Sequence, residues 1–175
     1  GPMARSPEDL AILLDVMSGA DPRQPLSATC WADSPTAPLP TAQPMRIGWL
    51  GDWGGAYPME PGILETTRAS LDVLADLGHR IEEVQPPFPA DRIWQAWSTL
   101  RSYALAASLR IFAGQRGQLK ASAQWELDRG LALTGQEVQS ASDLRSDWQR
   151  SAARLFERYD ALILPTAQCW PFDIK

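Results

Sequence analysis

The sequence has little of the chemistry that metal sites and disulfides need. Among its 175 residues there is one histidine, His79, and there are two cysteines, Cys30 and Cys169. A metal site usually needs several histidine, cysteine or carboxylate ligands at short spacing, so the sequence argues against a bound metal. The two cysteines lie near opposite ends of the chain, and without a secretory context we expect two free thiols rather than a disulfide. We therefore expect no metal and no other cofactor.

The scarcity of histidine also argues against a histidine-based hydrolase. A Ser–His–Asp triad would have to use His79, and the sequence has no Gly-x-Ser-x-Gly turn to present a nucleophilic serine. His79 follows Leu77 and Gly78 at the entry to a predicted strand, where a partly exposed structural residue is favoured over a general base. We therefore reject a catalytic centre of this type.

The sequence has no excess of positive charge and no long apolar run. Its formal net charge is -5 and its isoelectric point is about 4.9, which argues against binding to nucleic acid or to a membrane surface. No apolar stretch approaches the ~18 residues of a spanning helix, and the first residues lack the pattern of an export signal. We expect a globular, cytoplasmic protein, because 45% apolar and 21% charged residues can form a substantial core.

What the sequence does contain begins with a well-capped helix. In GPMARSPEDLAILLDVMSG, Ser6 is placed to accept a hydrogen bond from the backbone of Asp9, and Pro7 occupies the first helical position. Leucines and a methionine then recur on one helical face, which predicts an amphipathic helix over residues 6–18. Residues 20–44 are rich in proline and small polar residues, and they predict an extended connector.

A strand, helix, strand pattern follows the connector. The run MRIGWL predicts a buried strand, the segment from Pro61 to Gly78 predicts a helix, and HRIEEV predicts a second strand. Short connections between these elements imply a right-handed parallel crossover. The apolar stripe of the helix is formed by Leu64, Leu71, Leu74 and Leu77.

Two motifs in this segment resemble functional sites but have simpler explanations. The glycines of LGDWGG lack the G-x-G-x-x-G spacing of a phosphate-binding loop, and Asp52 and Glu60 would repel an anion. Glu82 and Glu83 lie on opposite faces of the predicted strand, so they cannot act together as acid and base on one substrate. We expect an ordinary loop and a solvated strand edge.

The rest of the chain predicts helices and a closing strand. Residues 90–113 form a long predicted helix, and residues 118–133 and 136–158 form two more. The run ALILPT predicts a third parallel strand. The packing stripes of the first and last of these helices are expected at Ile93, Trp97, Leu100, Ala104 and Leu105, and at Leu144, Trp148, Ala152 and Leu155. Residues 45–175 therefore predict an α/β fold, with a short, mostly parallel sheet of about three strands covered by several helices.

The order of these segments resembles the amidase signature family, serine hydrolases that cleave amide bonds with a Ser, cis-Ser, Lys triad. The resemblance rests on GPMARSPEDLAILLDVMSGADPRQP, MRIGWL, TRASLDVLADLGHRIEEVQPP and YDALILPT, which follow the family's order and cover nearly the whole chain. It implies a partial amidase-signature fold in which residues 1–175 are a C-terminal fragment of an amidase domain. The family's lysine and both serines lie upstream of the GPMAR segment, so the missing partner is the N-terminal catalytic half of the same polypeptide.

The resemblance assigns no catalytic residue to this chain. The two lysines are Lys120, in a predicted helix, and Lys175, at the last position, and neither has the strand and Ser-Gly-rich loop that would let it act as a base. The resemblance implies a parent enzyme that hydrolyses a small amide, and a fragment that is inactive alone and lines the substrate pocket. The family's long helix and the loop after its LPT strand supply four wall candidates, Trp97, Tyr103, Thr166 and Cys169. For Trp97, packing is the favoured role.

Two other functions stay open. The chain could be a noncatalytic binding module, and the exposed sheet edge and helix faces of a truncated α/β domain would favour self-association. It could also be an unrelated small ligand-binding α/β domain, if the ordered motif matches arise by chance. The sequence upstream of Gly1 would separate these hypotheses, because the hydrolase requires a lysine-bearing strand and a Gly/Ser-rich signature there.

Overall fold

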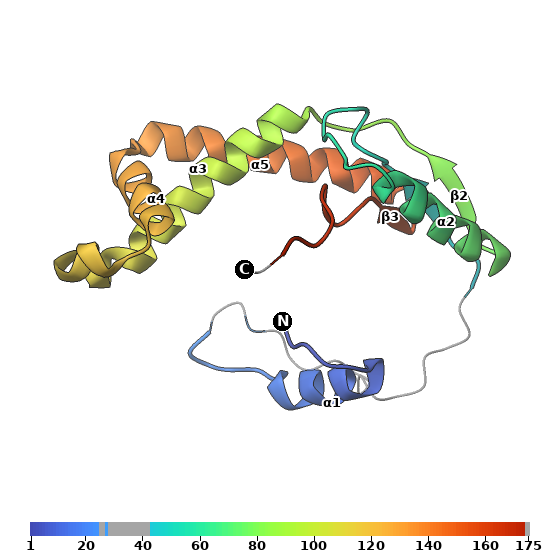
Figure 1. Cartoon of the computed structure of the whole chain (residues 1–175), viewed down its shortest axis with the longest axis horizontal. Coiled ribbons are helices and arrows are strands. Elements are labelled where there is room, and N and C mark those ends of the chain that lie inside the picture. The colour runs from blue at the N-terminus through green and yellow to red at the C-terminus, as the bar shows by residue number, and fades with distance from the viewer. Residues whose placement is uncertain (25–26, 28–42, 174–175) are drawn as a thin grey trace. The chain divides into compact units, whose positions relative to one another are not determined.

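The computed structural model describes residues 1–24, 27 and 43–173, which belong to two units, Gly1–Gln43 and Pro44–Lys175. Within these residues the first unit holds a single helix, and the second holds the sheet and the other helices (Figure 1). Cys30 and most of the predicted connector lie outside the described residues. None of the described helices combines the length and the apolar character needed to cross a membrane.

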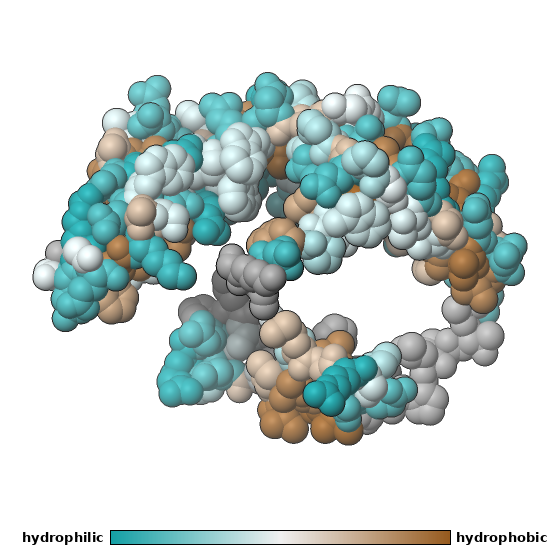
Figure 2. All heavy atoms as spheres, in the orientation of Figure 1, coloured by the Kyte–Doolittle hydropathy of each residue, from teal (hydrophilic) through white to brown (hydrophobic). Residues whose placement is uncertain are grey.

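The first unit contains α1 (Pro7–Met17), which begins as the sequence predicts. The Ser6 hydroxyl accepts a hydrogen bond from the backbone N–H of Asp9 at 3.1 Å, and the proline lies in the first turn. No residue of α1 is buried among the described residues, and its apolar side chains gather on one side of the helix (Figure 2). The predicted stripe is present.

The second unit is built on a sheet whose described strands are β1 (Arg46–Trp49), β2 (Arg80–Glu83) and β3 (Ala161–Ile163). The order is β2-β1-β3, and both pairings are parallel, which confirms the predicted sheet. Ile47 of the central strand lies opposite Ile81 and Ala161. Because the strands are parallel, the loops that follow them leave from the same edge of the sheet.

The crossover between β1 and β2 is α2 (Ile63–Asp76), where the sequence predicts a helix. Ile63 and Leu71 are its buried residues, and the helix packs on β2. The prediction that Leu77 belongs to the buried stripe is wrong, because this residue is the C-cap and is 70% exposed. The helix stops there since Gly78 adopts a left-handed φ of 93° that turns the chain toward β2.

The helical part of the second unit consists of α3 (Ala90–Leu109), α4 (Ala121–Ala132) and α5 (Gly135–Phe156). α3 packs on both of the others and runs beside α5 (Figure 1). The helix predicted over residues 90–113 is shorter, because the chain tightens at Arg110 into the 3₁₀ segment η1 (Arg110–Gln118). α5 begins at a capping box formed by Thr134 and Glu137.

The buried face of α3 differs from the predicted one. Its buried side chains are small, namely Ala96, Ser98, Thr99, Ser102 and Ala106. Trp97 and Ala104 are exposed, so their predicted packing positions are wrong. The reason is the close approach of α4, since a Cβ placed on Gly130 would lie only 2.1 Å from the Ser102 carbonyl oxygen. Only small side chains fit between backbones this close, and the large ones turn outward.

One tryptophan joins the loop after β1 to the helices. Trp53 is buried with a positive φ of 64°, and its indole N–H donates to the backbone carbonyl of Phe88 at 2.9 Å. Its ring meets Trp148 of α5 edge-on, with the ring centroids 5.5 Å apart. In the same loop the Asp52 carboxylate accepts the Gly55 N–H at 2.9 Å. This loop therefore fixes the position of α5 relative to the sheet.

Candidate functional site

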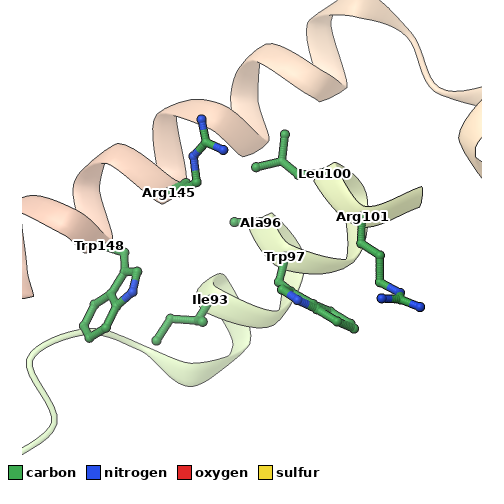
Figure 3. Close-up of a pocket in the computed structure, with 7 residues that line it drawn as sticks. All are labelled: Ile93, Ala96, Trp97, Leu100, Arg101, Arg145 and Trp148. Atoms are coloured by element: carbon green, nitrogen blue, oxygen red, sulfur yellow. The ribbon is translucent and has the colours of Figure 1, made fainter. Parts of the chain in front are cut away.

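A cavity of about 460 Å³ opens between α3 and α5 (Figure 3). Its walls are Ile93, Ala96, Trp97, Leu100 and Arg101 from α3, with Arg145 and Trp148 from α5. The α3 residues recur at spacings of three and four, so they share one stripe of that helix. The volume lies in the range of small-molecule sites, and most of the walls are apolar, as such sites usually are.

Two tryptophans form the aromatic walls, and other rings hold each of them. Trp148 contacts Trp53 and also Phe88, whose ring centroid lies 6.1 Å away. Trp97 stacks on Trp94 with centroids 5.1 Å apart and planes at 29°. Such ring pairs have preferred geometries and add stability beyond the area that they bury. The cavity therefore has flat apolar surfaces, already oriented, on both helices.

Two guanidinium groups belong to the walls, and among the described residues Arg101 has an ion-pair partner whereas Arg145 does not. Arg101 Nε lies 2.9 Å from Glu126 Oε1 of α4, and its guanidinium lies 5.2 Å from the Trp97 ring centroid. The Ser102 hydroxyl donates to the other Glu126 oxygen at 2.7 Å, and this bond together with Arg101 lowers the pKa of the Glu126 carboxyl. Arg145 forms no ion pair with any described residue.

Two of the four predicted wall candidates lie on α3. Trp97 lines the cavity and is 50% exposed. In Figure 3 it lies beside Arg101, whereas Ile93 and Trp148 approach each other from the two helices. Tyr103 is also exposed, but it lies six residues further along, about 120° around the helix, and is not a wall of this cavity.

The other two candidates, Thr166 and Cys169, are exposed in the segment that follows β3. This segment is fastened to the loop before α2. The Glu60 N–H donates to the Gln168 carbonyl at 2.9 Å, and the Trp170 N–H donates to the Glu60 carboxylate at 2.9 Å. Neither candidate lines the cavity between α3 and α5, so the four predicted residues do not form one site in the described residues.

The sequence does not predict that residues of α5 line the cavity. The pattern predicts Trp148 as a packing residue and gives Arg145 no role. A cavity between two helices depends on how they cross, which the pattern of one helix does not specify. One signal is present in the sequence: Arg145 has no acidic residue three or four positions away, where an exposed arginine often finds a partner.

A second polar cluster lies on the sheet around Glu82. This carboxylate accepts two hydrogen bonds from Arg46, at 2.9 and 3.0 Å, and one from the Tyr159 hydroxyl at 3.2 Å, while Arg80 lies 2.9 Å away. The hydrogen bonds from Arg46 are the main cause that lowers the pKa of Glu82 to about 2. β2 is an edge strand of the described sheet and Glu83 is exposed, as expected, but Glu82 is half-buried, and Arg46 and Arg80 flank it on one face of the sheet. Glu83 pairs instead with α2.

His79 has the structural role expected for it. Its Nδ1 accepts the Met45 backbone N–H at 3.1 Å, and the residue is half-buried at the start of β2. Within the described ranges, no three His, Cys, Asp or Glu residues are grouped so that they could hold a metal ion. The cavity between α3 and α5 is therefore the candidate site.

Comparisons with known protein sequences match this chain to one family. A sequence model of the Amidase family matches residues 1–175. An indoleacetamide hydrolase of Bradyrhizobium japonicum is 28% identical over 176 residues, which cover 95% of this chain and 35% of that protein. A glutamyl-tRNA(Gln) amidotransferase subunit of Chloroflexus aurantiacus is 33% identical over 200 residues, which cover 99% and 40%. The chain thus spans 35% to 40% of the length of these two relatives.

Solved structures share the fold. A bacterial aryl acylamidase of the amidase signature enzymes has a TM-score of 0.83 at 23% identity, with 98% of this chain and 37% of that chain covered. The 6-aminohexanoate cyclic dimer hydrolase, solved with its substrate, has a TM-score of 0.75 at 22% identity, with 95% and 37% covered. These structures confirm the partial α/β fold that the sequence predicts.

Proposed function

The chain belongs to the Amidase family, and on that premise we propose that it is the C-terminal part of a longer amide-bond hydrolase. The N-terminal half supplies the catalytic serines and lysine, while this part carries scaffold and forms one wall of the pocket for a small amide. The observation that carries the proposal is the cavity between α3 and α5, which has suitable volume, apolar walls and Trp97 among them.

The extent of the matches supports the assignment of residues 1–175 to part of an amidase domain. The chain corresponds to 35% of the Bradyrhizobium hydrolase and 37% of the aryl acylamidase. The rest of those proteins has no counterpart in this chain. The proposed partner of this chain is that remaining part, in the same polypeptide.

The position of Lys120 supports a catalytic centre outside this chain. Lys120 is exposed at the start of α4, and no described serine hydroxyl is hydrogen-bonded to its ammonium group. A lysine that activates a serine needs that serine within hydrogen-bond reach. Lys175 lies outside the described residues. The chain alone is therefore proposed to be inactive.

A fixed apolar wall assists amide hydrolysis without touching the reacting atoms. It holds the apolar part of the substrate so that the amide carbon faces the nucleophile, and it excludes water from that side. Trp53 and Phe88 support the Trp148 ring from behind the cavity, which limits its movement. The proposed contribution of this chain is therefore orientation and shape selectivity.

Two measurements on the 175-residue chain test the proposal. Incubated with 2-naphthamide, the chain alone should release no ammonia above the uncatalysed rate, and robust turnover would overturn the placement of the catalytic groups. In a calorimetric titration 2-naphthamide should bind, because its rings fit the apolar cavity.

Matched tryptophan variants locate that binding. Trp97→Ala should weaken it about tenfold through the loss of an aromatic contact. Trp125→Ala is the control, because Trp125 does not line the cavity and is similarly exposed, at 59%. Each of the two tryptophans also has an arginine guanidinium above its ring, Arg101 at Trp97 and Arg129 at Trp125. Absence of binding, or equal affinity of the two variants, would contradict the role of the cavity.

A second function is favoured by exposed apolar side chains, among them Trp94, Ile111, Trp125, Leu131 and Phe156. We also propose that the chain by itself associates with a second copy through these helix faces or through β2 and β3, the edge strands of the described sheet. In the longer enzyme the N-terminal half would cover some of these surfaces. Sedimentation should show a dimer or larger species, and a clean monomer at high concentration would remove this proposal.

A further inference from the structure

Within the described residues, Arg145 is the arginine of α3, α4 and α5 whose side chain has neither an ion pair, a hydrogen bond nor an aromatic ring as partner. Arg92 lies over Phe88, and Arg129 and Arg154 bond to serine hydroxyls. Arg101 pairs with Glu126 across two helices, and Arg150 pairs with Asp147 on α5 itself. The residues three and four positions from Arg145 are Ala141, Ser142, Trp148 and Gln149, none of which is acidic. Asp143 and Asp147 flank Arg145 at two residues' distance, but neither forms an ion pair with it, so within the described residues Arg145 has no ion-pair partner.

The walls around Arg145 carry no negative charge. Its neighbours in the cavity from α3 include Ala96 and Leu100, and no aspartate or glutamate lines the cavity. Glu126 lies nearby, but its two oxygens are already bonded to Arg101 and Ser102. The cavity lining therefore holds one cation, Arg145, that has no ion-pair partner among the described residues, although the chain as a whole has a net charge of -5.

A cation beside apolar walls favours one kind of ligand. Near apolar surface a charge attracts an opposite charge more strongly than it does in bulk water, and a guanidinium presents paired donors that match the two oxygens of a carboxylate. The side chain of Arg145 is exposed, and in Figure 3 its guanidinium points away from Ile93 and Trp148. It can therefore meet a ligand group at the mouth while the apolar part of the ligand lies against those two side chains.

We propose that this cavity selects an amide whose apolar part carries a carboxylate, and that Arg145 binds this carboxylate. The inference rests on the proposed function, because it names the substrate class of the same pocket. It makes Arg145 a specificity-determining residue, while the apolar walls supply the affinity that charged and uncharged amides share.

The test compares two amides that differ by one charge, 2-naphthamide and 6-carbamoyl-2-naphthoate. Titrated calorimetrically into the 175-residue chain near neutral pH, the carboxylate-bearing amide should bind about threefold more tightly, the size expected for an exposed ion pair. The preference should shrink as salt is added, because the interaction lies at the solvent-exposed mouth. Arg145→Gln should bring the two affinities together.

Arg150→Gln is the matched control, since it removes the same charge from α5 away from the cavity, and it should keep the preference. Circular dichroism checks that both variants retain their helices. Equal affinities in the unmodified chain, or a preference that survives in Arg145→Gln, would overturn the inference while binding of 2-naphthamide still supports the pocket. If neither amide binds, the proposed function of the cavity fails as well.

Discussion

The sheet and the helices of the second unit bury different kinds of side chain. Around the central strand and its loop the buried residues are large, namely Ile47, Trp49, Leu50 and Trp53. On α3 the buried residues are small, and the large ones that stay exposed include Trp94, Trp97 and Tyr103. Large buried side chains stabilise a fold through the area that they remove from water. We infer that the sheet region carries more of the stability, and that the helical region keeps aromatic surface for other contacts.

The largest effect is expected from the centre of the sheet. Ile47 is 2% exposed, so Ile47→Ala should lower the free energy of unfolding by about 3 kcal/mol through lost burial and the cavity left behind. Urea unfolding followed by circular dichroism measures this change. Ile111→Ala, at a 75% exposed position of η1, is the control and should change the stability by less than about 0.5 kcal/mol. Similar losses in the two variants would contradict the contrast between the regions.

The next largest loss of stability is expected where α3 and α4 cross. Gly130→Ala should cost about 2 kcal/mol, because the new Cβ would overlap the Ser102 carbonyl and force α3 and α4 apart. The control is Gly117→Ala, where an added Cβ meets nothing within 4 Å. If the Gly130 variant unfolds at the same urea concentration as the unsubstituted chain, the two helices are not held by this close approach.

A third effect depends on pH and tests the polar side of the sheet region. The pKa of Glu82 is about 2 in the folded chain, below its ordinary 4.5, because Arg46 stabilises the carboxylate. This contribution to stability is fully present above pH 4.5 and is lost as the pH falls toward 2. Glu82→Gln should therefore flatten the pH dependence of unfolding in that window. An unchanged slope would mean that the cluster does not stabilise the fold.

The smallest effect is expected on the exposed face of α3. Trp97→Ala should lower the free energy of unfolding by about 1 kcal/mol, less than Gly130→Ala, because half of this side chain is already in water and the main loss is its stacking on Trp94. The same urea titration measures it. A loss as large as that of Gly130→Ala would show that the exposed tryptophans hold the helices together, and the distinction between the two faces of α3 would disappear.

Local patterns were enough to predict the elements of the fold. The cap at Ser6, the proline and glycine that bracket α2, and the short apolar strands are properties of neighbouring residues. The parallel sheet follows from them, because a helix between two strands with short connections leaves one handedness available. These features could be predicted since each depends on few residues.

The buried face of α3 and the cavity depend instead on contacts between distant residues. A stripe of large apolar residues normally indicates the core face, and on α3 this rule fails because Gly130, far along the chain, brings another backbone close. Arg145 reaches the cavity only through the crossing of α3 and α5. The partners of Glu82 likewise follow from strand register, in which Arg80 lies opposite Arg46. None of these contacts has a signature within one segment.

The contact between Trp53 and Trp148 also gives the chain an intrinsic spectroscopic reporter. Their rings lie 5.5 Å apart at 68°, so their electronic transitions are expected to couple and to contribute a paired signal to the circular dichroism of the folded chain. Separation of the β1 loop from α5 would remove this contribution, while the helical bands and any contribution of the Trp94–Trp97 pair remain. The joint between sheet and helices can therefore be followed optically, without any added label.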